Sequence, residues 1–136
     1  MSLTAIQGAS LIAAHSLLTK LTISLTLRVY QFLEPDPKRR QSVESSSYVQ
    51  QVQKAQTNES QYDALLVGLL LFFSSRDADV SLASTLAVIG QIGYVWTRTF
   101  LGYPAIPSIA MAVIRYSGLL LLSWSLYQIA FENKSA

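Results

Sequence analysis

The chain of 136 residues contains no cysteine, one histidine and few charged side chains. Without cysteine it can form no disulfide, no thiolate metal site and no cysteine nucleophile. The one histidine, His15, cannot form a metal cluster by itself, and we expect it to be a packed helix residue because it lies in an apolar run. The net charge of +2, without a basic block, gives no indication of a nucleic-acid partner. Because the chain has no cysteine and a single histidine, we predict no metal site.

Apolar residues make up 51% of the chain, and only 13% of its residues are charged. This is the composition of a membrane protein rather than a soluble one. Four long apolar runs, separated by polar or proline-containing segments, predict spans at about 3–33, 47–74, 81–100 and 108–131. The predicted fold is a single all-α domain, 1–136, in which four helices cross the lipid bilayer up-down-up-down.

Two cations interrupt the first apolar run. A cation that faces lipid is costly, so Lys20 should face the interior of the bundle or a subunit contact. Arg28 lies near the end of the run, where it could anchor the helix at the membrane interface or contact a ligand.

The segment 34–47 is predicted to be a loop, because Pro35 and Pro37 each remove a backbone donor and disfavour helix in the preceding residue. It contains the densest cations of the chain, Lys38, Arg39 and Arg40. Positive loops stay on the cytoplasmic, stromal or matrix side, so the triplet orients the first hairpin. A contact with substrate or lipid is the alternative role.

The run 81–100 carries small residues, Ala83, Ala87, Gly90 and Gly93, that allow a neighbouring helix to approach closely. These small residues are predicted to be structural rather than catalytic.

The helix predicted from residue 47 begins with a polar surface. Steps of three and four residues place Lys54, Asn58, Gln61 and Tyr62 on one face. The string Lys54-Ala55-Gln56-Thr57-Asn58-Glu59-Ser60-Gln61-Tyr62 resembles the second-helix signature of the MAPEG family, membrane-associated proteins of eicosanoid and glutathione metabolism. The similarity is to its leukotriene C synthase and microsomal glutathione transferase varieties. Lys54 stands where the family has arginine, and Gln61 where it has glutamate.

A second segment, Arg98-Thr99-Phe100-Leu101-Gly102-Tyr103, is similar to the family's Arg-Tyr-Phe-x-Gly-Tyr. The resemblance implies a homotrimer that binds glutathione as co-substrate between neighbouring subunits, near the cytoplasmic ends of the helices. It also implies a lipophilic substrate that arrives from the bilayer.

Glutathione has two carboxylates, one ammonium group and one thiol. On this resemblance Lys54 and Arg28 would meet the carboxylates, and Asn58 and Gln56 would bond the peptide groups. Tyr62 and Tyr103 would hold polar groups through their hydroxyls. Gln61 would meet the ammonium group with a neutral bond, about half as strong as the charge-assisted bond of a glutamate.

The family's chemistry needs a glutathione thiolate, and a nearby cation favours that form. The family usually has an arginine for this early in the fourth helix, but residues 104–113 contain none. Arg98 is our catalytic candidate. Arg115, the second candidate, lies deeper in the last span and is interpreted instead as a member of a buried ion pair or a hydrogen-bonded packing residue, with Asp63 or Glu59 as possible partners.

Three functions remain open. The first is a membrane glutathione transferase or peroxidase. The second is a MAPEG-fold subunit without catalysis that belongs to a larger membrane assembly. The third is an unrelated four-helix membrane protein. The expected location is the endoplasmic reticulum or an organelle membrane, of a chloroplast or a mitochondrion.

Overall fold

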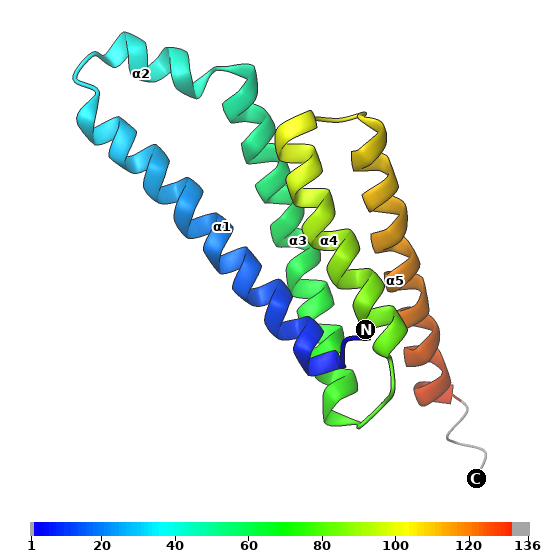
Figure 1. Cartoon of the computed structure of the whole chain (residues 1–136). Coiled ribbons are helices and arrows are strands. Elements are labelled where there is room, and N and C mark those ends of the chain that lie inside the picture. The colour runs from blue at the N-terminus through cyan, green and yellow to red at the C-terminus, as the bar shows by residue number, and fades with distance from the viewer. Residues whose placement is uncertain (1, 132–136) are drawn as a thin grey trace.

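The computed structural model describes residues 2–131, which form helices and no β-strand (Figure 1). The helices are α1 (Ala5–Leu33), α2 (Pro37–Glu44), α3 (Ser47–Ser75), α4 (Ser81–Leu101) and α5 (Ile106–Phe131). The all-helical prediction is confirmed, and the four long helices begin and end within two residues of the predicted spans.

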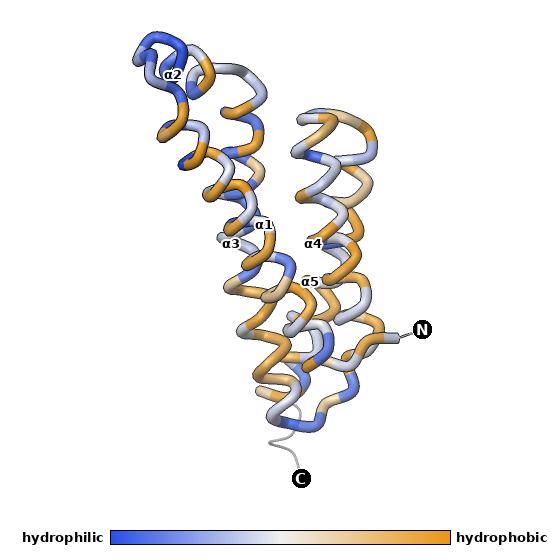
Figure 2. The backbone as a smooth tube through the Cα atoms, turned by 60° about the vertical axis from the view of Figure 1, so that its left-hand side comes forward, coloured by the Kyte–Doolittle hydropathy of each residue, from blue (hydrophilic) through white to orange (hydrophobic). Residues whose placement is uncertain are grey.

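Two of these helices, α1 and α5, are long and apolar enough to cross a membrane by length and composition. Only 17% of the most apolar window of α1 and 22% of that of α5 is buried within the chain. Most of their apolar surface therefore faces outward. Figure 2 shows a concentration of hydrophilic residues around α2, at one end of the molecule, and a smaller one in the turn between α3 and α4 at the other end. The start of α1 and the end of α5 lie at the other end (Figure 1).

The segment predicted as a loop contains a short helix instead, α2. Its N-cap is Asp36, whose side chain accepts a hydrogen bond of 2.9 Å from the backbone amide of Lys38. Pro37 occupies the first turn, where its missing N–H is not needed and its fixed φ suits a helix. The prediction was wrong because a proline that cannot continue a helix can still occupy the first turn of one.

Side-chain hydrogen bonds support the starts of several helices. Thr4 and Gln7 form a capping box at α1, and the Ser46 hydroxyl accepts from the backbone of Val49 at α3. Asp79 accepts from the Ser81 amide at α4, and this hydrogen bond lowers the pKa of the exposed carboxyl below its ordinary value. Helix α4 ends at Gly102, whose φ of +79° lies in the left-handed region.

The helices pack closely at one end and diverge at the other. The hydrophobic core lies among the N-terminal half of α1, the C-terminal half of α3 and the start of α4, with Leu122 from α5. Every buried residue of α1 lies between Ala5 and Thr19. From Leu21 to Leu33 this helix leaves α3 and α4, and α2 bridges the gap between the far ends of α1 and α3 (Figure 1).

Helices α4 and α5 approach each other almost backbone to backbone. A Cβ added to Gly90 would collide with the backbone of Arg115, and one added to Gly118 would lie 2.6 Å from the backbone nitrogen of Ala87. Ala83, Ala87 and Gly90 are buried and Gly93 is half-buried. The prediction that these small residues allow a close helix contact is confirmed.

We expect Gly90→Ala to lower the free energy of unfolding by about 1–3 kcal/mol, because the added methyl group forces α4 and α5 apart. Gly68→Ala is the matched control, since a Cβ there meets nothing within 4 Å. It should leave stability unchanged or raise it by up to about 1 kcal/mol through helix propensity. Denaturant unfolding in detergent, followed by circular dichroism, measures both. Equal stability of the two variants would contradict the packing described here.

Candidate functional site

The predicted site residues Lys54, Asn58, Gln61 and Arg98 line one polar cavity of about 630 Å³ between α3 and α4. Lys54, Arg98 and Tyr103 also line an adjoining hollow of about 330 Å³. We call the two together the polar cleft. Its remaining lining residues are Ser47, Gln50, Gln51, Gln53 and Thr57.

The lining of the polar cleft contains two cations and no carboxylate. The acidic residues in this part of α3, Glu59 and Asp63, are buried against other helices. Helical periodicity explains the division, because residues 54, 58 and 61 share a face of α3 that residues 59 and 63 do not. The cleft therefore attracts an anionic or zwitterionic ligand.

Arg98 comes from the last turns of α4 and is held by two tyrosines. Its guanidinium lies 5.5 Å from the ring centre of Tyr94 and 5.7 Å from that of Tyr103. It also donates a hydrogen bond to the Tyr94 hydroxyl. These contacts fix the orientation of the half-buried arginine. The hydrogen bond uses only one guanidinium nitrogen, so the side chain still lines the cleft.

A hydrogen bond from the buried Arg115 orients the Asn58 side chain, which lines the cleft. The Arg115 Nη1 atom donates a 3.0 Å hydrogen bond to Asn58 Oδ1. An amide that accepts through its oxygen keeps its two N–H groups for other partners. Asn58 can therefore donate to a carbonyl or carboxylate oxygen in the cleft.

Three predicted site residues do not line the polar cleft. The Tyr62 hydroxyl bonds that of Tyr116 at 2.7 Å. Gln56 is half-buried, and its Nε2 atom has no partner among the described residues. Arg28 is exposed on α1, at the end of the helix that diverges from the rest. Within one chain, the structure thus brings together Lys54, Asn58, Gln61, Arg98 and Tyr103 but not the other three.

Arg115 is 1% exposed and, as predicted, it is a hydrogen-bonded packing residue. Its predicted carboxylate partners were wrong, because its bonds go to two neutral amides: Asn58, and Gln91 Oε1 at 3.2 Å. Its guanidinium lies over aromatic rings, 3.8 Å from the centre of Tyr62 and 4.2 Å from that of Tyr94.

Gln91, fully buried on α4, links the arginine to the acids and was missed in the sequence. Its oxygen accepts from Arg115, and its Nε2 donates to Asp63 Oδ1 at 2.8 Å and to the Glu59 carbonyl at 3.3 Å. The sequence could have indicated it, because Gln91 is an amide in the middle of an apolar span and such a side chain needs hydrogen-bond partners inside the bundle.

The second carboxylate, Glu59, is fully buried against α1. It accepts a 3.0 Å hydrogen bond from the Thr19 hydroxyl, and His15 Nδ1 lies 3.2 Å away. Lys20 is half-buried and donates to the Ser16 hydroxyl at 2.8 Å. Polar side chains of α1 and α3 thus meet midway along α1, and His15 and Lys20 face the interior of the bundle as predicted.

No protein-family model, curated protein or solved structure matches this chain significantly. The resemblance to the MAPEG family therefore rests on this chain's own sequence: the segments 54–62 and 98–103, together with the helix order, the basic first loop and the long second helix.

Replacing Gln91 with methionine, which has a similar shape, should lower stability by about 2–4 kcal/mol, because Arg115 and Asp63 each lose a buried hydrogen bond. Gln128→Met, at an exposed position of α5, should change little. In a double-mutant cycle with Arg115→Met the two effects should be less than additive, since the residues share one bond. Additive effects would show that the contact contributes nothing.

Proposed function

We propose that this chain is a MAPEG-like membrane protein that binds glutathione and uses it to conjugate or reduce a lipophilic substrate. The single observation that carries the proposal is the polar cleft, where Lys54 and Arg98 meet several side-chain amides, Asn58 and Gln61 among them, without any carboxylate. A tripeptide with two carboxylates and one ammonium group suits this charge. On this proposal all four long helices cross the bilayer, with α2 on the cytoplasmic, stromal or matrix side.

In the proposed complex the groups of glutathione are divided among the lining residues. Lys54 binds one carboxylate, and the N–H groups of Asn58 donate to a peptide carbonyl. Gln61 accepts from the ammonium group through its amide oxygen. Tyr103 offers its hydroxyl from the hollow beside Arg98.

Arg98 stabilises the glutathione thiolate. A thiol with a pKa of about 8.5 loses its proton more readily beside a fixed cation. The thiolate then attacks an electrophilic carbon of the substrate, forming the C–S bond while the bond to the leaving group breaks and the leaving group takes the electron pair. Arg115 is less suited to this role because it is buried and bonded to Asn58 and Gln91.

The second carboxylate of glutathione needs a cation from elsewhere. Arg28 lies about 200° around the helix from Thr26, which faces α3 and α4, so it points away from its own chain. A neighbouring copy in a homotrimer would bring its Arg28 to the cleft of this chain. The proposed site is therefore complete only between subunits.

The alternative is a MAPEG-fold subunit that has lost catalysis and belongs to a larger membrane assembly. Two observations favour it. The cleft has no carboxylate for the ammonium group, and the first turns of α5 contain no charged residue. This subunit would keep the helix packing and bind no glutathione.

Gln61→Glu should strengthen glutathione binding roughly tenfold, because it replaces a neutral amide acceptor with a carboxylate that forms an ion pair with the ammonium group. The control is Ser60→Glu, which adds the same charge to an exposed position outside the cleft and should leave affinity unchanged. Isothermal titration calorimetry on the detergent-purified protein measures both, and native mass spectrometry gives the number of copies. If neither the wild type nor Gln61→Glu binds glutathione, the non-catalytic subunit is the better description.

Arg98→Ala should lower kcat roughly 100-fold with a general electrophile such as 1-chloro-2,4-dinitrobenzene. The rate against pH should also shift upward, because without the cation the thiol pKa returns toward about 8.5. Arg76→Ala, at the opposite end of α3, removes the same charge outside the cleft and should change neither quantity. An unchanged pH profile in Arg98→Ala would remove Arg98 from the proposed chemistry.

A further inference from the structure

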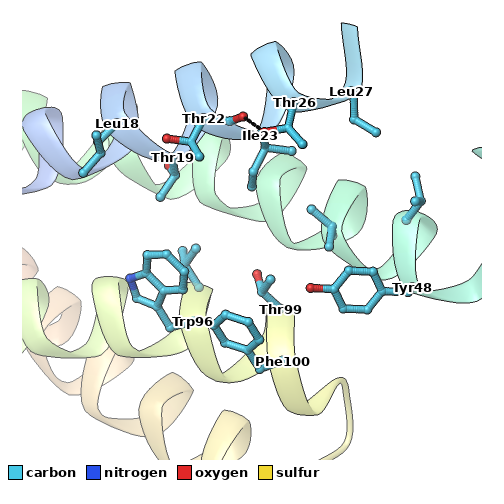
Figure 3. Close-up of a pocket in the computed structure, with 13 residues that line it drawn as sticks. Leu18, Thr19, Thr22, Ile23, Thr26, Leu27, Tyr48, Trp96, Thr99 and Phe100 are labelled. Atoms are coloured by element: carbon cyan, nitrogen blue, oxygen red, sulfur yellow. Dashed lines mark hydrogen bonds between the residues drawn. The ribbon is translucent and has the colours of Figure 1, made fainter. Parts of the chain in front are cut away.

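The divergence of α1 leaves an apolar groove of about 410 Å³ between it and helices α3 and α4 (Figure 3). The lining comes from α1 between Leu18 and Leu27, from the start of α3 at Tyr48, and from the end of α4 at Trp96 and Phe100. None of the groove residues lines the polar cleft. The groove is therefore a separate site on the other side of the contact between α3 and α4.

Two of the four threonines in this groove have hydroxyls that bond within the protein, so they offer mainly their methyl groups. The Thr26 hydroxyl donates to the Thr22 carbonyl at 2.7 Å, and the Thr19 hydroxyl donates to the His15 and Ser16 carbonyls and to Glu59. These two hydroxyls are used within the protein, which leaves the groove few side-chain polar groups, the hydroxyls of Thr22, Thr99 and Tyr48 among them, too few to pair with an extended peptide backbone. Its surface suits a hydrocarbon chain.

The length and position of the groove match one leaflet of a bilayer. From Leu18 to Leu27 the groove extends roughly 14 Å along α1, close to half of the ~30 Å hydrocarbon thickness. It begins near the middle of α1 and runs to the end bridged by α2 (Figures 1 and 3). A lipid chain that entered it would place its headgroup beside α2.

The end beside α2 offers cations for a phosphate group. Of the three acids there, only Asp36 lies within salt-bridge distance of a cation, 3.9 Å from Arg39; Glu44 accepts from Gln31 at 2.6 Å and lines a hollow with Arg40, and Glu34 accepts from the backbone of Asp36. Among the described residues, Lys38 and Arg40 form no salt bridge.

Within the described part of the chain, Arg40 lacks a hydrogen-bond partner as well as a salt bridge. Its Nε atom is buried and makes no hydrogen bond with the described residues. A guanidinium presents a planar fork to phosphate oxygens, which is the geometry that a phosphodiester fits.

We propose that the groove binds one acyl chain of an anionic glycerophospholipid from the leaflet on the α2 side, with the lipid phosphate held by Lys38 and Arg40. The site anchors the diverging half of α1 to the rest of the bundle through lipid. This inference rests on the membrane placement in the proposed function but not on glutathione.

Trp96 lines the groove and can report its occupant directly. The chain has two tryptophans, and Trp124→Phe on α5 leaves Trp96 as the only fluorophore of this type. The delipidated protein is titrated in detergent with phosphatidylglycerol whose acyl chains carry bromine, a contact quencher. We expect quenching that saturates at one lipid per chain. Diacylglycerol with the same brominated chains should need at least a fivefold higher concentration, because it lacks the phosphate.

Two pairs of variants test the site in this background. Ile23→Phe with Thr26→Phe fills the groove and should weaken saturable quenching at least fivefold, whereas Leu21→Phe with Leu25→Phe, on exposed positions outside the groove, should not. Lys38→Gln with Arg40→Gln should abolish the preference for phosphatidylglycerol over diacylglycerol. Arg76→Gln, at the other end of the bundle, should preserve it.

Equal quenching by both lipids, or saturable quenching that the groove-filling pair leaves intact, would overturn the proposal. The proposal would also be overturned if no quenching occurred and native mass spectrometry found another copy of the chain but no lipid. A second copy would then cover the groove. If the groove-filling pair loses its helical circular dichroism, the Lys38 and Arg40 pair decides the question. Glutathione binding, measured on the same samples, should be unchanged in every variant, so failure of the lipid site and failure of the proposed function remain distinguishable.

Discussion

The burial of the Arg115 guanidinium is the constraint around which the middle of this bundle is built. A charge removed from water needs partners, and here the Nη1 atom donates to two amides and aromatic rings from α3 and α4 cover the guanidinium, in place of a carboxylate. Gln91 then carries the connection onward to Asp63. Because one amide has its oxygen on the cation and its nitrogen on the acid, three helices are fixed in register by a single side chain.

The same arrangement divides the polar residues of α3 between two tasks. Glu59 and Asp63 tie α3 to α1 and α4 inside the bundle, whereas Lys54, Asn58 and Gln61 are left for the polar cleft. Asn58 belongs to both sets, since Arg115 holds its oxygen while its nitrogen is available to the cleft. The interior network thus sets the orientation of a group in the candidate site.

The positions of the long helices could be predicted because apolar runs, prolines and polar turns are local signals. Helix α2 was missed because Pro37 was taken only as a helix breaker, although Asp36 before it is a good N-cap. The clustering of Lys54, Asn58 and Gln61 follows from helical periodicity within α3. The position of Arg98 beside them depends on how α4 packs on α3, and the up-down topology predicted only that both lie at the same end of the bundle. The partners of Arg115 could not be predicted, since the choice between Gln91 and the acids is made by three-dimensional packing. The divergence of α1 has no local signal at all.

The contact between α3 and α4 has a consequence for the field inside the polar cleft. The Gln51 side chain bonds the Thr99 carbonyl at 2.8 Å and lies against Gly102, closing the seam between the cleft and the apolar groove behind it. One side of this thin wall therefore carries the charges of Lys54 and Arg98, and the other side is a medium of low permittivity. Because the apolar groove screens the two cations little, more of their electric field is directed toward the open cleft. The groove thereby acts as an insulator that increases the reach of two charges toward an approaching anion.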